Sequence, residues 1–223
     1  MLSQAIGALL PSAVGVALSP IPIIAVILML STERARSNGI AFSIGWIAGL
    51  TVVSIVVVTL VGGTDPASTA DDGVNWLKVG LGVLFLAMAR RQWRSRPKAG
   101  EQAEMPGWMQ TVDHFTAPKS LGLGVVLSAL NPKNLALTLA AAASVGQAGL
   151  SAGDDAIAIA VFVVLSSITV VGCVVVYVVA PRAAEKPLAA MNEFMSAHNA
   201  VIMMIVLLLL GAKLIGDGFG GLG

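Results

Sequence analysis

Lys133 is the one charged residue that falls clearly inside a long apolar stretch of this sequence. Asn131, Pro132 and Asn134 surround it in the segment "ALNPKNLALT". An ammonium group, side-chain amides and a helix N-terminus are groups that bind phosphate, sulfate or carboxylate. We therefore predict that Lys133, Asn131 and Asn134 bind the anionic part of a substrate. The alternative interpretation is a lysine that donates to backbone carbonyls left unpaired by the proline.

The motif around Pro132 has a counterpart near the start of the chain. "ALSP" at residues 17–20 recurs as "ALNP" at residues 129–132, an offset of 112 residues. Proline lacks the backbone N–H that a helix interior needs, so Pro20 and Pro132 predict two broken helices. Ser19 and Asn131 are suited to cap the half-helix that begins after each break, and Ser19 joins the predicted substrate-binding residues.

The breaks have a functional and a purely structural interpretation. Backbone groups freed inside a membrane are tolerated only within the protein or along a water-filled cavity. Recurrence of the motif, each time with a capping residue, favours a functional break near the centre of the protein. Pro20, Pro22 and Pro132 are then the hinge residues. The alternative is a pair of proline kinks that only shape two helices.

Composition places these motifs in a membrane. Hydrophobic residues make up 57% of the 223 residues and charged residues 11%, whereas a soluble domain has about 25% charged residues. Apolar stretches of about 20 residues, enough to cross a bilayer as a helix, recur along the chain. We predict an all-α integral membrane fold with six transmembrane helices, at residues 5–30, 38–62, 74–92, 119–145, 155–180 and 196–216.

The repeat divides the chain into two halves. We predict a first three-helix repeat at residues 1–92, a cytoplasmic linker at 93–118 and a second three-helix repeat at 119–223. Because three is an odd number of spans, the second repeat must be inverted, and helices 1 and 4 are the ones broken at prolines. Many secondary transporters have inverted repeats, with substrate sites between discontinuous helices near the midplane.

The distribution of charge predicts the orientation. Ten of the 13 Lys and Arg residues lie in or beside the loop 31–37, the linker and the loop 181–195. The other loops, "GGTDPASTADDG" and "SVGQAGLSAGDD", contain Asp and no basic residue. The positive-inside rule then places the linker in the cytoplasm. We expect a multi-pass protein of the bacterial plasma membrane with both termini outside.

Several function classes lack the residues that they need. The sequence has no nucleophile–base pair, no metal-ligand cluster and no glycine-rich phosphate loop, and Cys173 is the one cysteine. We therefore expect no enzyme activity, no cofactor, no metal and no nucleic-acid partner. No Asp or Glu lies in a predicted span core, which argues against a carrier of cationic amino acids or metal ions.

A second pattern predicts close helix packing. "GWIAG" at residues 45–49 places two glycines one helical turn apart, which lets another helix approach closely. We expect the neighbour to be the broken first span, and the alternative is a second copy of the chain.

The segments "SPIPIIAVILML" and "NPKNLAL" resemble the paired proline motifs of the lysine-exporter (LysE) superfamily of small efflux carriers. With its short basic loop after the first span, its acidic outer loop and its long linker, the chain looks most like the actinobacterial GAP branch. This branch comprises the glycopeptidolipid- and sulfolipid-addressing proteins, and the resemblance covers essentially the whole chain. It implies assistance in moving cell-envelope glycolipids across the plasma membrane of a mycobacterium or relative.

One departure from the superfamily bears on the substrate. Amino-acid exporters tend to carry Pro-Gly-Pro followed by a polar residue, whereas this chain has Pro20-Ile21-Pro22-Ile23. The wholly apolar segment suits a lipid-like substrate better than an amino acid, and we expect it to accommodate the apolar part.

These features predict a transporter of an anionic amphiphile, a cell-envelope glycolipid or lipid precursor, that works by alternating access. The expected partners are membrane lipids, the anionic lipid or glycolipid substrate, and a second copy of the chain or a larger lipid-export complex. One alternative function is proton-driven efflux of a small solute such as an amino acid. Another is a non-transporting membrane scaffold for a lipid-export complex, in which the linker 93–118 makes the contact.

Overall fold

The computed structural model describes residues 1–62, 76–96 and 107–219, and every regular element in these ranges is a helix. The predictions for the acidic loop after the second span and for the middle of the linker therefore lie outside the described residues. The elements are α1 (Leu2–Ala17), α2 (Pro20–Leu30), α3 (Ala35–Gly62), α4 (Trp76–Arg94), the 3-10 helix η2 (Gly107–His114), α5 (Ala117–Val125), the π-helical turn η3 (Val126–Leu130), α6 (Pro132–Gly146), α7 (Ala152–Val179) and α8 (Pro181–Phe219).

Two pairs of consecutive helices are bent at the proline motifs. The axes of α1 and α2 differ by 50°, and those of the α5–η3 segment and α6 differ by 61°. Pro20 and Pro132 each occupy the first position of the helix that follows the bend. At that position the missing N–H leaves no helical hydrogen bond unmade, and the fixed φ angle favours helix initiation.

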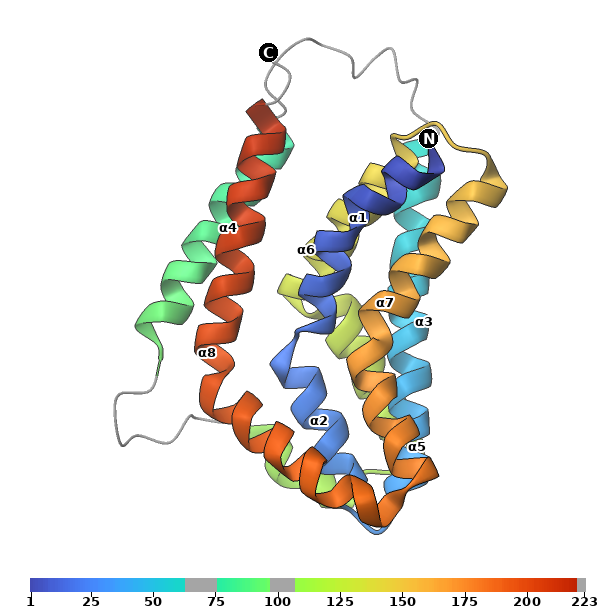
Figure 1. Cartoon of the computed structure of the whole chain (residues 1–223), viewed down its shortest axis with the longest axis vertical. Helices are drawn as coiled ribbons and strands as arrows, with labels where there is room; N and C mark the ends of the chain where they lie inside the picture. Colours follow the sequence, from blue (N-terminus) through green and yellow to red (C-terminus); the bar gives the residue numbers. More distant parts are fainter. Residues whose placement is uncertain (63–75, 97–106, 220–223) are drawn as a thin grey trace.

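Each bent pair runs along the length of the bundle (Figure 1). α1 begins at the end where α8 finishes, which we call the terminal end, and α2 continues towards the opposite end. In the second pair, α5 packs against the first half of α3, and α6 packs against its second half. Cβ atoms built at Gly124 and at Gly146 would contact Phe42 and Val58, respectively. α5 and α6 therefore lie one after the other along α3.

Length and apolar composition identify the segments that can cross a membrane. α3, α7 and α8 each qualify, and each bent pair qualifies as well if it counts as one span. The described residues thus contain three to five candidate spans. α4 is a helix but is not among them, because its 19 residues include Lys78, Arg90, Arg91 and Arg94. The regular elements of the described residues are all helical, and several of them are apolar enough to make this a multi-pass membrane protein.

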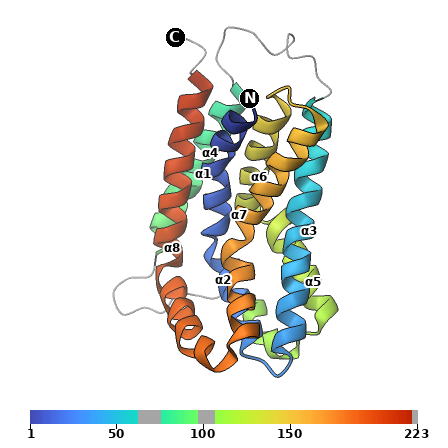
Figure 2. The same cartoon turned by 45° about the vertical axis from the view of Figure 1, so that its right-hand side comes forward.

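α4 and α8 form a closely packed pair (Figures 1 and 2). A Cβ atom at Gly82 would lie 2.8 Å from the carbonyl oxygen of Gly211, and one at Gly211 would lie 2.9 Å from that of Gly82. Both positions need glycine because real Cβ atoms do not approach a backbone oxygen so closely. The contact is reciprocal, since each glycine meets the carbonyl of the other.

The "GWIAG" segment makes an internal contact, as predicted, but with a different helix. A Cβ atom at Gly45 would overlap the carbonyl oxygen of Leu121, and one at Gly49 would overlap the hydroxyl of Ser128. The neighbour is therefore the α5–η3 segment of the second bent pair, not the first. Gly124 faces α3 in the same way and lets the two backbones come together.

Residues 181–195 differ from the sequence prediction. We expected a loop, whereas this segment forms the first part of α8 and lies across the opposite end of the bundle before the helix turns along α4 (Figure 1). Its alanine, glutamate and methionine residues favour helix. Ala184 and Leu188 anchor it, with 0% and 8% of their surface exposed.

Candidate functional site

The two bends meet in the interior, and side chains of one half bind backbone or side-chain groups of the other. The Ser19 hydroxyl donates to Oδ1 of Asn134 at 2.7 Å. Nζ of Lys133 donates to the carbonyl oxygen of Gly15 at 2.8 Å. Thr169 of α7 donates its hydroxyl proton to the carbonyl oxygen of Ala17 at 2.7 Å. We call this group of residues the crossing.

The carbonyls used at the crossing are those that the first bend leaves available. In a continuous helix the N–H of Ser19 would donate to Gly15, but here it donates to Val16 at 3.1 Å. The carbonyl of Gly15 is then free to accept from Lys133. A carbonyl buried in a membrane protein must find a partner. The second half of the chain therefore supplies donors to the break in the first half.

Side chains of the second bent pair itself bond most of the backbone groups that the second bend leaves unpaired. The N–H of Lys133 donates to Oδ1 of Asn131 at 3.1 Å, which is the predicted helix cap. Nδ2 of Asn134 donates to the carbonyl oxygen of Leu127 at 2.9 Å, within the π-helical turn. Single π-helical turns are frequent at functional sites in proteins.

The predicted substrate-binding residues thus have structural partners in this arrangement. Ser19, Lys133 and Asn134 are buried together, whereas Asn131 is half-buried and caps α6. Ser19 stands at the N-cap position of α2 but makes no cap hydrogen bond, because its hydroxyl is directed to Asn134. Pro22 is buried in the first turn of α2, beyond the bend.

Two groups at the crossing had no assigned role in the sequence prediction. The Gly15 carbonyl carries no signal, because every residue type has a backbone carbonyl and only the fold selects this one. Thr169 is one of many hydroxyl residues in apolar helices, and such hydroxyls often bond to their own backbone. Its pairing with Ala17, 152 positions away, follows from helix packing.

The charge of Lys133 has no described acidic partner. Its side chain is 2% exposed, and the ion pair within the described ranges is Lys213–Asp217 on α8. One hydrogen bond is described for an ammonium that carries three donors. The contact to Gly15 matches the structural alternative from the sequence, and the other two donors have no partner among the described residues.

The apolar Pro20–Ile24 segment does not line a cavity around the crossing. Ile23 and Ile24 are 0% and 3% exposed and belong to the hydrophobic core. None of the described cavities is lined by this segment, so its predicted contact with an apolar substrate part stays a prediction.

One cavity extends from the terminal end towards the crossing. It encloses about 300 Å³ between α1, α3, α4, α6 and α8, and we call it the terminal cavity. Leu137 and Leu210 line it, and their methyl groups would lie 3.0 and 2.9 Å from a Cβ atom at Gly15. The side chains at the inner end of this cavity therefore contact Gly15, whose carbonyl oxygen accepts the hydrogen bond from Lys133.

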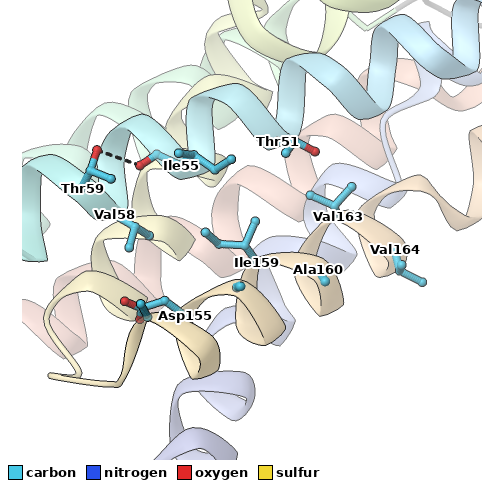
Figure 3. A pocket seen from close by; sticks show the side chains of 11 residues that line it. Thr51, Ile55, Val58, Thr59, Asp155, Ile159, Ala160, Val163 and Val164 are labelled. Atoms are coloured by element: carbon cyan, nitrogen blue, oxygen red, sulfur yellow. Dashed lines mark hydrogen bonds between the residues drawn. The ribbon is translucent and has the colours of Figure 1, made fainter.

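Further hollows lie outside the crossing, among them a polar one of about 650 Å³ between residues 31–34 and 114–116. A groove of about 540 Å³ separates α3 and α7, and Figure 3 shows Thr51, Val58, Ile159 and Val163 along its sides with Asp155 at one end. At the opposite end of the bundle, a cavity of about 440 Å³ lies between α2, α7 and the first part of α8. Within the described part of the chain, no three His, Cys, Asp or Glu side chains are grouped to hold a metal ion.

Comparisons with known proteins identify a family. No curated protein and no solved structure matches this chain. The family described as "Sap, sulfolipid-1-addressing protein" matches residues 9–220, which include the crossing, both bends and every lining residue of the terminal cavity except Ala8. The chain therefore belongs to the sulfolipid-1-addressing protein family.

Proposed function

We propose that this protein is a carrier, not an enzyme, that exports an anionic amphiphile across the bacterial plasma membrane. The substrate is a cell-envelope glycolipid or a precursor of one. The family is named for the addressing of a sulfolipid, and a sulfolipid has an anionic head and apolar chains. In this proposal α4 also crosses the membrane, which brings the five candidate spans to six. The two halves of the chain are then inverted three-helix repeats.

The pairing of elements supports the inverted repeat. An axis that exchanges the two halves exchanges α4 with α8, and the reciprocal Gly82–Gly211 contact fits such an axis, with the two glycines 129 positions apart instead of 112. The contact of α3 with α5 has its counterpart in the contact of α7 with α1. The bends at Pro20 and Pro132 are likewise separated by the offset of 112 residues.

The observation that carries the proposal is the buried amine of Lys133, which has no acidic partner among the described residues. A lone ammonium inside a membrane protein is expensive, and such residues usually serve a ligand or ion pathway. The backbone of Lys133 is in the first turn of α6, whose unpaired N–H groups and dipole also attract an anion, whereas its ammonium reaches the last turn of α1 at Gly15. A sulfate or phosphate head would supply the missing negative charge.

The hydrogen bonds at the crossing suggest how the carrier moves. The bonds from Lys133 to Gly15 and from Ser19 to Asn134 join the two halves at their bends. An anionic head at Lys133 competes with the Gly15 carbonyl and weakens this connection. The halves then rock about Pro20 and Pro132, and the crossing opens to one side of the membrane at a time.

The test compares Lys133→Ala with Lys133→Arg in cells that lack the native gene. We expect the alanine variant to lose most export and the arginine variant to retain part of it, because arginine keeps the charge. Untargeted lipidomics of surface-extracted lipids gives the readout, and membrane protein levels correct for expression. Lys186→Ala, on the exposed first part of α8, is the matched control.

Two results would contradict this proposal. Normal surface lipids with Lys133→Ala would remove the anion site. Loss of export on replacing the linker residues 97–106 by a neutral spacer, with Lys133→Ala still active, would favour the scaffold function.

A further inference from the structure

The terminal cavity has walls and a mouth of different chemistry. Leu137, Ala140 and Ala143 of α6 face Leu210 and Leu214 of α8 across an almost wholly apolar interior. Gln147, Lys213 and Asp217 line the end of the cavity that lies at the terminal end of the bundle. An apolar interior with a few polar groups at one end is the general form of a site for an amphiphile.

The interior also contains a polar group without a partner. Ser12 of α1 is 8% exposed and lines the cavity, and within the described ranges no hydrogen bond is recorded for its hydroxyl. Buried hydroxyls normally have a partner. Ser12 is therefore available to a bound molecule in a cavity that helix packing has left open.

The charges at the mouth are weakly held. Lys213 and Asp217 form an ion pair one turn apart on α8, and their side chains are 42% and 43% exposed. Pairs of this kind contribute little to stability. Lys213 can therefore exchange the carboxylate for another anion, and Gln147 offers an amide donor beside it.

The repeat relates the terminal cavity to the cavity at the opposite end. Leu139, Ala143 and Ser144 line the first, and Ile27, Ser31 and Thr32 line the second. Each member of one set lies 112 positions from its counterpart, the same offset as the two proline motifs. A packing defect would have no reason to recur at the same positions of both repeats.

We propose that the terminal cavity binds the substrate amphiphile as it leaves, with one alkyl chain between α6 and α8 and the anionic head at Lys213. This inference deepens the proposed function and rests on it for the identity of the amphiphile. It concerns a second position for the head, distinct from Lys133. The chain tip reaches Leu137 and Leu210, next to Gly15 at the crossing.

The test is photolabelling of the purified full-length protein in phosphatidylcholine nanodiscs. The probe is hexadecyl sulfate with a diazirine at the end of the chain, and mass spectrometry locates the adducts. We expect saturable labelling of residues along the inner half of the cavity, at Leu137, Leu210 and their neighbours. Excess unlabelled hexadecyl sulfate should abolish it.

Matched variants separate the cavity from the general lipid-facing surface. Ala140→Phe and, as a milder change, Ala143→Leu fill the cavity and should remove most of the labelling. Ala160→Phe adds the same bulk as Ala140→Phe in the α3–α7 groove of Figure 3 and should leave labelling unchanged. Lys213→Gln should weaken competition by hexadecyl sulfate about fivefold, the value of one exposed charge contact. It should not affect competition by a neutral alkyl maltoside.

The two proposals can fail separately. Labelling that is spread over the membrane-facing helices and insensitive to Ala140→Phe would overturn the cavity site, whatever Lys133→Ala does to export. Equal competition by hexadecyl sulfate and hexadecyltrimethylammonium would overturn the role of Lys213. Specific labelling combined with normal export by Lys133→Ala would retain the cavity and remove the anion site at the crossing.

Discussion

Ser19 joins the two bent pairs through one hydrogen bond, which makes it a test of the crossing. Ser19→Ala removes the donor and leaves Oδ1 of Asn134 buried without it. We expect the free energy of unfolding to fall by about 0.6 kcal/mol, the mean measured for hydrogen bonds between membrane helices, and by no more than about 1.7 kcal/mol, the largest value measured. Unfolding in mixed detergent micelles measures the change. Ser3→Ala, exposed on α1, is the control, and an equal effect of the two variants would show that the bond contributes nothing.

Local chemistry predicted some of the site, and tertiary contacts determined the rest. The Asn131 cap follows from its position before Pro132 and is confirmed by the hydrogen bond from the Lys133 N–H. The donation from Ser19 to Asn134 joins residues 115 positions apart and competes with the cap that sequence predicts for Ser19. Sequence identified Lys133 as exceptional, but its acceptor is a backbone atom that no residue type indicates.

At the scale of elements, two glycines of α5 give opposite predictions. A Cβ atom at Gly124 would overlap the backbone of Phe42, whereas one at Gly122 has nothing within 4 Å. We expect Gly124→Ala to destabilise the protein by about 1 to 3 kcal/mol, because two helix backbones must move apart. Gly122→Ala should be neutral or stabilising by up to about 1 kcal/mol, since alanine favours helix. Thermal unfolding in detergent compares the two, and equal stabilities would contradict the close packing of α3 and α5.

Helix positions were more predictable than helix partners. Apolar stretches place α3 and α7 within a few residues of their predicted ends, because hydrophobicity is a local property. The GxxxG pattern predicted a close contact but not α5 as the neighbour. Two glycines one turn apart make a flat helix surface, and any other helix can pack against it. The first part of α8 was expected to be a loop because charge interrupts the apolar pattern, yet its residues favour helix and two of them are buried.

At the scale of the molecule, the orientation can be tested with the single native cysteine removed. In a Cys173→Ala background, Ser3→Cys lies near the terminal end and Ser37→Cys near the opposite end, and both positions are exposed. The positive-inside rule predicts that a membrane-impermeant maleimide labels Ser3→Cys in intact cells. Ser37→Cys should react only after permeabilisation. The reverse pattern would invert the proposed direction of export.

The two repeats predicted from the sequence are not separate bodies in space. α1 packs against α6 and α7 of the second repeat, and α3 packs against α5. The crossing is made by donors and acceptors from both halves. Internal sequence symmetry revealed the offset, but a repeat in sequence does not say how the copies interlock.

The pairing of α4 with α8 also has a consequence for biosynthesis. α8 follows α4 in the chain with α5, α6 and α7 between them, so α4 leaves the ribosome well before its glycine partner. During that interval α4, with its four basic residues, is a poor candidate to remain in the bilayer alone. We therefore expect the first half of the nascent chain to be incompletely folded, and the membrane insertion of α4 to need insertion factors or to be delayed. A stop codon after the linker should accordingly yield a fragment that cells degrade.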